Sequence, residues 1–373
     1  LYKVEPWFGA PVTVNEGHKF LVISLRKCSK RGYGPCAYRL STRKACAGCK
    51  YHKLELPAPK FKEVQNLEPY DYLVMEKKKP TGQLKSVTIT EYEQHTNTAR
   101  TRTIYMDYDF GYFLGYTLGD GSIFPRGYIV WTHPPEGAKK FEMIAKKLFP
   151  NNALTVQPDS KSNARVQKLW HKGIVEWIRK TFPNKHVRMQ WLEQCPVEFL
   201  RGFCDGFIDA DGLRSHERFF QHDLNRFSAF IYAAFLTGRL SAIRYEILKP
   251  REGGRLNSRP TVHLEATLQK SKPKVFETDS YYLIPIRKVT PLRRTGVVVG
   301  IETNNHRFVI PFYISRNTEW LTVEGVVPPG KVGATKYEYG VFSIVDKPTV
   351  YIGAVKPDFV EFFLYGKRFT GRW

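Results

Sequence analysis

The pattern of hydrophobic and polar positions changes twice along the chain. Near the N-terminus, stretches such as Lys19-Phe-Leu-Val-Ile23 have the short apolar runs typical of β-strands. From Asp107 to about Gln269, segments with a helical period alternate with short β-prone runs. Beyond residue 275 the strand pattern returns, while the polar stretch 76–103 is typical of a linker. These changes predict a mixed helical and β region between β-rich arms.

The central region contains the same order of elements twice. Each copy begins with a glycine-rich helix, and a strand, an amphipathic helix and two further strands follow it. The expected elements after the glycine-rich helices are 128–132, 137–148, 153–157 and 164–170 in the first copy, and 217–221, 224–238, 243–248 and 260–268 in the second. Two copies of one unit in a single chain predict an α+β domain with pseudo-twofold αββαββα architecture.

Small residues recur at every fourth position of both glycine-rich helices. The matched positions keep a constant offset of 91 residues, and they are Gly111, Gly115 and Gly119 in the first helix and Gly202, Gly206 and Ala210 in the second. Glycine costs a helix interior about 1 kcal/mol relative to alanine, so this spacing favours two helices whose backbones nearly touch. Gly121 and Gly212, which follow the helices, are expected to be left-handed C-terminal caps.

Each helix is expected to end in an aspartate, Asp120 or Asp211. A carboxylate is disfavoured at the negative end of a helix dipole, so a positive partner is expected there. Paired helices bring the two carboxylates together, where they would hold Mg²⁺ for an in-line phosphodiester displacement. One Asp-Gly pair alone is better explained as a capping turn. Two pairs at a fixed offset, each after helix-face glycines, favour a metal site.

The charged-residue composition predicts a polyanionic partner. The 373 residues contain 58 Lys and Arg against 35 Asp and Glu, a formal net charge of +23 spread along the chain. Nucleic acid is the commonest partner of such a protein, and a cationic surface kept for solubility is the alternative. No run of about 18 apolar residues and no secretory signal pattern is present, so neither a membrane partner nor export is expected. We expect a monomer in an intracellular compartment, in the cytoplasm, nucleoid or nucleus.

The two aspartate motifs resemble those of a known family. Cys204-Asp-Gly-Phe-Ile-Asp-Ala-Asp-Gly212 resembles the LAGLIDADG motif, and Phe113-Leu-Gly-Tyr-Thr-Leu-Gly-Asp-Gly121 resembles its degenerate form. The chain is therefore similar to two-motif, single-chain LAGLIDADG homing endonucleases. The resemblance implies metal-dependent hydrolysis of both strands of a long double-stranded DNA site, with the sheets in the major groove. It also implies two or three Mg²⁺ ions at Asp120 and Asp211, with the Gly119 and Ala210 carbonyls as further ligands.

The family also has polar residues near its metal ions and basic residues on its strands. His133 and Gln221 match loosely the positions that organise metal-bound water, and Lys168 is the candidate for a central basic catalytic residue. Guanidinium and ammonium groups on or between the strands can reach phosphates or guanine edges. The candidate DNA-binding residues are Arg126, Lys161, Arg165, Arg214, Arg218, Lys249, Arg251, Arg255 and Arg259.

The β-rich arms resemble the splicing domain of inteins (the Hint fold). Thr13 to His18 resembles its N-terminal block, and the stretch from Val297 through His306 to Asn317 and Thr318 resembles its C-terminal blocks. In that family the terminal Asn cyclises and the next residue is the nucleophile. Arg316 stands where the family has a His, and no nucleophile is present at Leu1. A decayed or incomplete splicing domain around an intein-encoded, mobile endonuclease is therefore expected.

Four of the six cysteines cluster in a basic stretch of the first arm. Cys28, Cys36, Cys46 and Cys49 could form a structural Zn²⁺ site, and nine basic residues between Arg26 and Lys53 would let this loop contact DNA. Free thiols in a basic loop are the alternative.

The expected domains follow from these motifs. They are a discontinuous β domain over 1–95 and 276–317 with a basic insertion at 26–53, an endonuclease domain over 104–275 with repeats at about 107–197 and 198–275, and a small C-terminal β module over 318–373. The competing functions are a self-splicing intein with secondary or lost nuclease activity, and a LAGLIDADG maturase or regulator that binds DNA or RNA without cutting.

Overall fold

The computed structural model divides the chain into two compact units. The first comprises residues 1–77 and 271–373, and the second comprises residues 78–270. The structure describes residues 1–92, 98–133, 135–152, 154–159, 163–248, 261–268, 275–292, 307–310, 313–316, 325–327, 340–342, 349–355, 360–365 and 370–372. Within these ranges no helix is long and apolar enough to cross a membrane.

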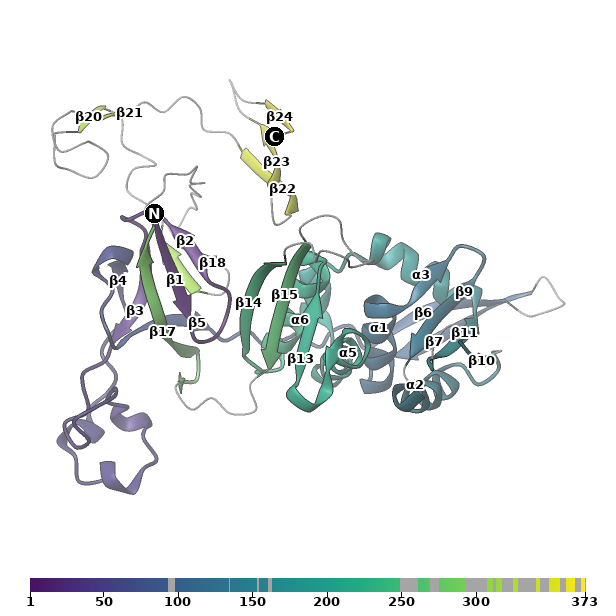
Figure 1. Ribbon diagram of the computed structural model, residues 1–373, viewed down its shortest axis with the longest axis horizontal. Coiled ribbons are helices and arrows are strands. Elements are labelled where there is room, and N and C mark those ends of the chain that lie inside the picture. Colours follow the sequence, from purple (N-terminus) through teal and green to yellow (C-terminus); the bar gives the residue numbers. More distant parts are fainter. Residues whose placement is uncertain are drawn as a thin grey trace. The chain divides into compact units, whose positions relative to one another are not determined.

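The first unit is built on an antiparallel sheet of nine described strands, which come from residues before and after the second unit (Figure 1). Its main order is β18-β19-β3-β5-β17-β1-β2, with β4 paired to β3 and β16 paired to β17. The strands are β1 (Tyr2–Pro6), β2 (Val12–Val14), β3 (Lys19–Ser24), β4 (Lys60–Glu63), β5 (Asp71–Glu76), β16 (Phe276–Glu277), β17 (Tyr281–Pro291), β18 (Arg307–Ile310) and β19 (Tyr313–Arg316). β1 and β5 pair with β17, so strands from before and after the second unit lie in one sheet.

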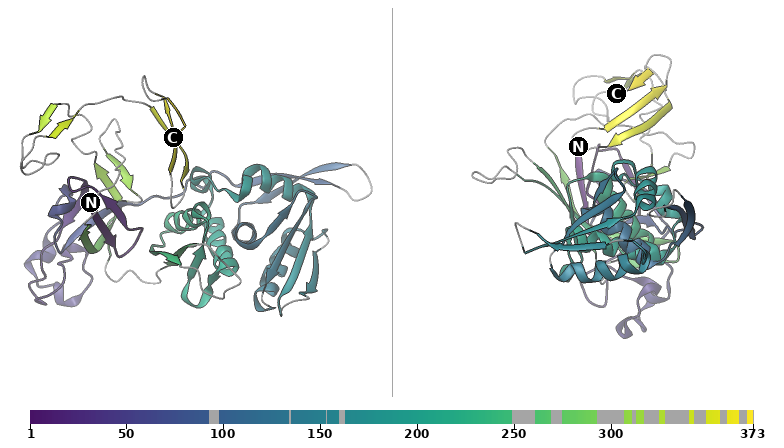
Figure 2. Two further views of the ribbon diagram at one scale, coloured as in Figure 1. Left: turned by 45° about the horizontal axis from the view of Figure 1, so that its top comes forward. Right: turned by 90° about the vertical axis from the view of Figure 1, so that its right-hand side faces the viewer.

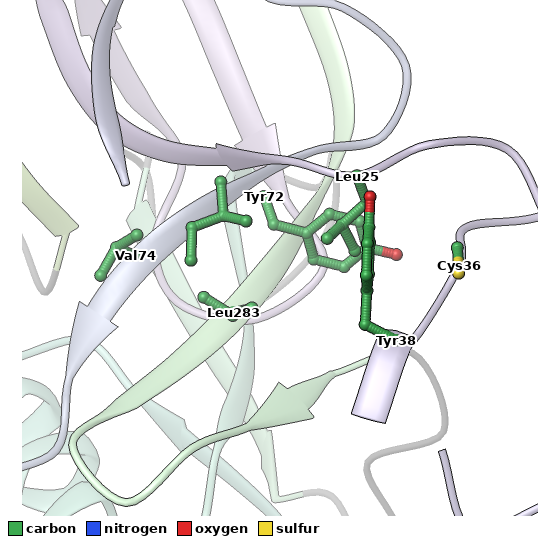
Figure 3. Close-up of a cluster of buried hydrophobic side chains, with 7 residues drawn as sticks. Leu25, Cys36, Tyr38, Tyr72, Val74 and Leu283 are labelled. Atoms are coloured by element: carbon green, nitrogen blue, oxygen red, sulfur yellow. The ribbon is translucent and has the colours of Figure 1, made fainter. Parts of the chain in front are cut away.

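The cysteine-rich insertion in this unit contains only short 3₁₀ turns. They are η1 (Tyr38–Leu40), η2 (Lys44–Cys46) and η3 (Lys50–Lys53), and η4 (Val64–Asn66) follows β4. A small apolar cluster anchors the insertion to the sheet, and Figure 3 shows its labelled members Leu25, Cys36, Tyr38, Tyr72, Val74 and Leu283. The C-terminal residues form short strands, β20 (Gly325–Val327), β21 (Gly340–Phe342), β22 (Thr349–Val355), β23 (Val360–Tyr365) and β24 (Thr370–Arg372).

The second unit has the repeated element order that the sequence predicts. The first copy contains α1 (Tyr108–Asp120), β8 (Ser122–Phe124), β9 (Tyr128–His133), α2 (Pro135–Leu148), β10 (Leu154–Pro158), β11 (Arg165–Trp170) and α3 (Lys172–Thr181). The second contains α5 (Val197–Asp211), β12 (Gly212–Leu213), η6 (Arg214–His216), β13 (Arg218–Gln221), α6 (Leu224–Leu236), β14 (Ser241–Leu248) and β15 (Thr261–Leu268). The turn η5 (Pro183–Lys185) and α4 (Met189–Gln194) connect the copies.

Each copy forms its own four-stranded sheet, and α1 and α5 lie side by side between the two sheets (Figure 1). The sheet orders are β10-β11-β9-β8 and β12-β13-β15-β14. The first turn of α1 is capped by Asp107, whose side chain accepts a 2.9 Å hydrogen bond from the Phe110 amide. The α+β class and the repeat are thus present as expected.

The segment predicted as a linker is instead a β-hairpin of the second unit. It consists of β6 (Ser86–Tyr92) and β7 (Ala99–Tyr105), which Figure 2 shows projecting from this unit. Ile89 and Ile104 on the hairpin are almost fully buried. A Cβ atom on Gly173 of α3 would lie 1.6 Å from the Thr90 carbonyl oxygen, so the helix backbone rests directly on the hairpin. The threonine-rich composition concealed an alternating strand with one buried face.

Candidate active site

The glycines of α1 and α5 allow direct contact between the two helix backbones. A Cβ atom on Gly111 would lie 2.0 Å from the Phe199 carbonyl oxygen, and one on Gly115 would lie 2.1 Å from that of Phe203. The reverse contacts are equally close, since a Cβ on Gly202 would lie 2.0 Å from the Tyr108 carbonyl oxygen. No side chain larger than hydrogen fits these positions. The close helix crossing predicted from the four-residue spacing is confirmed.

The glycines after the helices have a different role from the predicted one. Gly121 has φ −69° and Gly212 has φ −130°, so neither is a left-handed cap. A Cβ on Gly121 would lie 2.7 Å from the indole nitrogen of Trp131, and one on Gly212 would lie 2.2 Å from the Arg218 carbonyl oxygen. These glycines are needed because the strand that follows each helix turns back against neighbouring groups.

Asp120 and Asp211, the last residues of the two helices, influence each other electrostatically. Partial burial and the charge of Asp211 raise the pKa of Asp120 to about 6. Burial also raises the pKa of Asp211, while the neighbouring Arg226, Lys185 and Gln221 favour its ionised form. Two carboxylates that repel each other at the ends of two helices form a site where a cation would be strongly favoured. The two aspartates are therefore close enough to interact electrostatically.

Two basic side chains that belong to none of the sequence motifs lie beside these carboxylates. The Lys185 ammonium donates to the Gly119 carbonyl at 3.4 Å, and the Arg226 guanidinium donates to the same carbonyl at 3.1 Å. Burial and the charge of Arg226 lower the pKa of Lys185 to about 8, although Asp120 and Asp211 oppose this shift. These two cations supply the positive partner expected at the negative helix ends.

The segment that carries Lys185 is held in place by the second repeat. Asn225 of α6 accepts a 2.8 Å hydrogen bond from the Val187 amide and donates a 3.0 Å bond to the Val187 carbonyl. Asn184 and Lys185 both have left-handed backbone conformations, with φ of 53° and 61°. Lysine adopts this conformation at a cost, and such strain often occurs at functional sites. The tertiary structure therefore fixes the lysine beside the carboxylates.

Gln221 and His133, predicted to be equivalent, have different surroundings. The Gln221 amide donates to Asp211 Oδ2 at 3.0 Å, and its oxygen accepts bonds from the amides of His222 and Asp223, which fixes its orientation. His133 is fully buried, and its Nδ1 lies 2.5 Å from the Tyr116 hydroxyl. Burial lowers the pKa of His133 to about 4, so the imidazole is neutral near pH 7. Gln221 thus contacts Asp211 directly, whereas His133 contacts Tyr116.

Lys168, the predicted central base, lies against aromatic rings. Its ammonium is 4.0 Å from the Tyr128 ring centroid and 3.9 Å from that of Trp170. Lys185 and Arg226, not Lys168, influence the pKa of Asp211. Lys185, which comes from the connection between the repeats, is therefore a second candidate for the central basic position.

The candidate DNA-binding residues fall into three groups. Arg165 is exposed on β11 of the first sheet, and Arg126 is exposed in the turn between β8 and β9. Arg214 makes ion pairs of 3.2 Å with Asp205 and 2.5 Å with Asp209, and Arg218 lies 3.6 Å from Glu265. Arg214 and Arg218 are therefore paired within the protein. Lys161, Lys249, Arg251, Arg255 and Arg259 lie outside the described residues.

The residues present suit Mg²⁺ at the helix ends. Mg²⁺ keeps several waters and needs only one or two carboxylates from the protein, and Asp120 and Asp211 can provide these. The Gly119 carbonyl, predicted as a further ligand, already accepts bonds from Lys185 and Arg226. Among the described residues, no three His, Cys, Asp or Glu side chains form a preassembled metal cluster. The Asp pair would therefore rely on water and substrate oxygens to complete the coordination, with Ala210 as the remaining predicted carbonyl ligand.

The cysteines of the first unit share one cavity of about 460 Å³. Cys28, Cys36, Cys46 and Cys49 all line it together with His52, and all four are free thiols. Hydrogen bonds from Arg31 lower the pKa of Cys28. The thiols are thus near one another but do not form a closed tetrahedral site in the region described.

Of the splicing-like residues, two can be placed. Thr13 is exposed on β2, and His18 is buried beside Phe20 with its pKa lowered to about 4 by burial. His306, Asn317 and Thr318 lie outside the described residues.

Comparisons with known proteins give matches among solved structures alone. No family model and no curated protein matches the sequence. A mesophilic variant of the homing endonuclease I-DmoI matches at 12% identity and a TM-score of 0.33, over 44% of this chain and 90% of that chain. I-DmoI in complex with DNA and Mn matches at 12% identity and a TM-score of 0.32, over 44% and 90%. The N-terminal LAGLIDADG domain of DUF199/WhiA matches at 11% identity and a TM-score of 0.28, over 43% and 76%.

Proposed function

We propose that this protein is a metal-dependent endonuclease that cuts both strands of double-stranded DNA at a specific site. The observation that carries the proposal is the meeting of Asp120 and Asp211 beside Lys185 and Arg226 in a chain of net charge +23. Carboxylates beside a phosphate backbone hinder simple binding, whereas phosphodiester hydrolysis needs them to hold divalent metal. The basic chain supplies attraction for the DNA, and the acidic pair supplies the reaction centre.

Each residue at the centre has a role in this reaction. Asp120 and Asp211 would hold Mg²⁺, which when bound activates water and stabilises the leaving oxygen. Gln221 holds Asp211 in one orientation through its 3.0 Å hydrogen bond. Lys185 has its pKa lowered to about 8, so its ammonium can offset developing negative charge on the phosphate and exchange a proton near neutral pH. Arg226 keeps the Gly119 end of α1 in place through its hydrogen bond to that carbonyl.

A cleavage assay on the full chain tests the function. The protein is incubated with Mg²⁺ and a plasmid library of random inserts, and the DNA ends are sequenced. We expect one discrete cut site, whose cutting is lost in Asp120→Asn and in Asp211→Asn while DNA binding is kept. Asp109→Asn, at the opposite end of α1, is the matched control and should cut normally. Binding without cutting by the unchanged chain would support a regulator or maturase instead.

For the first unit we propose a splicing-type β domain that carries a zinc-binding basic loop. The intein-like sequence blocks support the first part, and the lining of one cavity by four cysteines and His52 supports the second. Zinc analysis of the purified chain should give about one equivalent, lost in Cys46→Ser with Cys49→Ser. Less than half an equivalent in the unchanged chain would exclude the zinc site. Splicing activity would require a mass change at Asn317 and Thr318 once an upstream block is supplied.

A further inference from the structure

Three aromatic side chains form a continuous row on the first sheet of the second unit. The Phe124 and Tyr128 rings are stacked with centroids 4.6 Å apart, and the Tyr128 and Trp170 centroids are also 4.6 Å apart. Strand pairing places Tyr128 opposite both Phe124 and Trp170, so the row runs across β8, β9 and β11. We call these three residues the aromatic row.

The row lies on the face of the sheet that points away from the core. Its neighbours along the strands, Ile129 and Leu169, are fully buried on the opposite face. In contrast, Phe124 is 38% exposed and Trp170 is 41% exposed. Adjacent exposed apolar side chains often mark a ligand-binding surface. The two exposed rings at the ends of the row are therefore available for stacking.

The charge around the row is positive. The Lys168 ammonium lies 4.0 and 3.9 Å from the Tyr128 and Trp170 centroids, and Arg126 is exposed in the turn that joins β8 to β9. The four strands of this sheet and the β8–β9 turn contain no Asp or Glu. The second sheet differs, because Glu246 lies on β14 and Glu265 on β15. Anions are thus favoured at the first sheet specifically.

We propose that the aromatic row and Lys168 form a binding site for unpaired nucleotides. Bases would stack on the exposed ring faces of Phe124 and Trp170, and Lys168 with Arg126 would contact the phosphates. Unpaired rather than duplex nucleic acid is favoured because base faces in a duplex are covered by their neighbours, whereas the grooves offer only base edges. Exposed aromatic residues on a helix-backed four-stranded sheet are the arrangement by which sheets bind single strands.

The row is close to the aspartate pair along the chain. Phe124 follows Asp120 by four residues through β8, which limits their separation to about 13 Å. A strand that is held by the row could therefore continue to the carboxylates. The proposal does not depend on nuclease activity, because binding of unpaired nucleotides requires neither metal nor cleavage.

Two probes of equal charge separate stacking from electrostatic attraction. Binding of the full chain, without metal, is measured by fluorescence anisotropy for a dye-labelled oligothymidine of about eight nucleotides and for an abasic oligomer with the same number of phosphates. We expect the oligothymidine to bind at least about 10-fold more tightly, with most of this preference retained at high salt. Equal affinities would overturn the proposal.

Variants locate the site. Trp170→Leu and Phe124→Leu should each reduce the preference for oligothymidine about 5-fold or more, while Tyr105→Leu, a more exposed aromatic outside the row, should not change it. Lys168→Gln should weaken both probes, and Lys146→Gln controls for the loss of one positive charge. Thermal melting confirms that each variant is folded, and Phe124→Leu on the edge strand provides a second test if Trp170→Leu unfolds. The assignment would be overturned if a folded Phe124→Leu variant kept the preference for oligothymidine over the abasic oligomer. It would also be overturned if the variants lost as much affinity for a duplex of random sequence as for oligothymidine.

Discussion

The Lys185 ammonium donates a hydrogen bond to the backbone carbonyl of Gly119, 3.4 Å away, at the end of the helix that carries Asp120. The lysine comes from η5, between α3 and α4, and not from either of the helices that carry the aspartates. Because Lys185 lies near both carboxylates, it offsets part of their mutual repulsion. The two aspartates are therefore related by the repeat, whereas the lysine beside them comes from one side only.

Replacing Lys185 should separate activity from stability. The folded state lowers the Lys185 pKa from 10.5 to about 8. The charged lysine therefore destabilises the folded state, with the full effect present below pH 8 and none left above pH 10.5. Lys185→Met should therefore raise the melting temperature at pH 7, with a gain that vanishes towards pH 10.5, and should reduce cleavage by about 100-fold or more. Lys180→Met, exposed at the end of α3, is the control. Full cleavage by Lys185→Met would remove the lysine from the mechanism.

Asp120→Asn should change how stability depends on pH. The folded state raises the Asp120 pKa from 3.8 to about 6, so the ionised carboxyl has no destabilising effect below pH 3.8 and its full effect above pH 6. Because the Asp120 side chain is only partly buried, solvent screens its charge, and we expect Asp120→Asn to stabilise the protein by a few tenths to about 1 kcal/mol at pH 7.5 and not at pH 3.5. Urea unfolding at both pH values measures this difference. A variant less stable than the unchanged chain at pH 7.5 would contradict the electrostatic account.

Divalent metal should stabilise the protein in a pH-dependent manner. A cation must displace the proton from Asp120, whose pKa is about 6, so its binding weakens as pH falls through 6. We expect Mg²⁺ or Mn²⁺ at 100 times its Kd to add about 2.7 kcal/mol at pH 7.5 and clearly less at pH 5. Differential scanning calorimetry of the unchanged chain and of Asp120→Asn provides the comparison. Equal stabilisation of both proteins would place the metal elsewhere.

Gly115→Ala should disrupt the helix pair, although alanine is the better helix former. The added Cβ would lie 2.1 Å from the Phe203 carbonyl oxygen, which belongs to a helix backbone and cannot move aside. We expect a loss of about 3 kcal/mol in the free energy of unfolding, with loss of cleavage. Gly17→Ala, whose Cβ would have no atom within 4 Å, should have little effect. A neutral Gly115→Ala variant would contradict the backbone contact.

Arg214 and Arg126 should differ in how they affect DNA binding. Arg214 is paired with Asp205 and Asp209, so Arg214→Gln should lower stability by about 1–2 kcal/mol and leave the salt dependence of DNA binding unchanged. Arg126 is exposed, so Arg126→Gln should leave stability unchanged. It should instead reduce the slope of log K for DNA binding against log salt concentration by about 0.9 per lost phosphate contact. Titrations at several salt concentrations distinguish the two. Identical slopes for Arg126→Gln and the unchanged chain would place Arg126 outside the interface.

The repeats and the two aspartates can be identified from the local sequence alone. The four-residue spacing of small residues can be read without a structure, because side chains four apart share a helix face. The hairpin at 86–105 was missed because threonines on its exposed face hide the burial of Ile89 and Ile104. Arg214 looked like any other surface arginine because its partners lie on the preceding helix, and only the fold brings them together.

The sequence by itself determined the α+β class, the duplication, the contact between the glycine-rich helices and the positions of Asp120 and Asp211 at the helix ends, since each depends on periodicity or on a repeated motif. The tertiary structure alone decided which side chains surround that pair. Lys185 and Arg226 arrive from the connection and from α6, while Lys168 turns to aromatic rings on the sheet. The reason is that the pKa of a carboxyl depends on charges within a few ångströms in space. The connection between the two copies, which supplies Lys185, has no periodic pattern in the sequence.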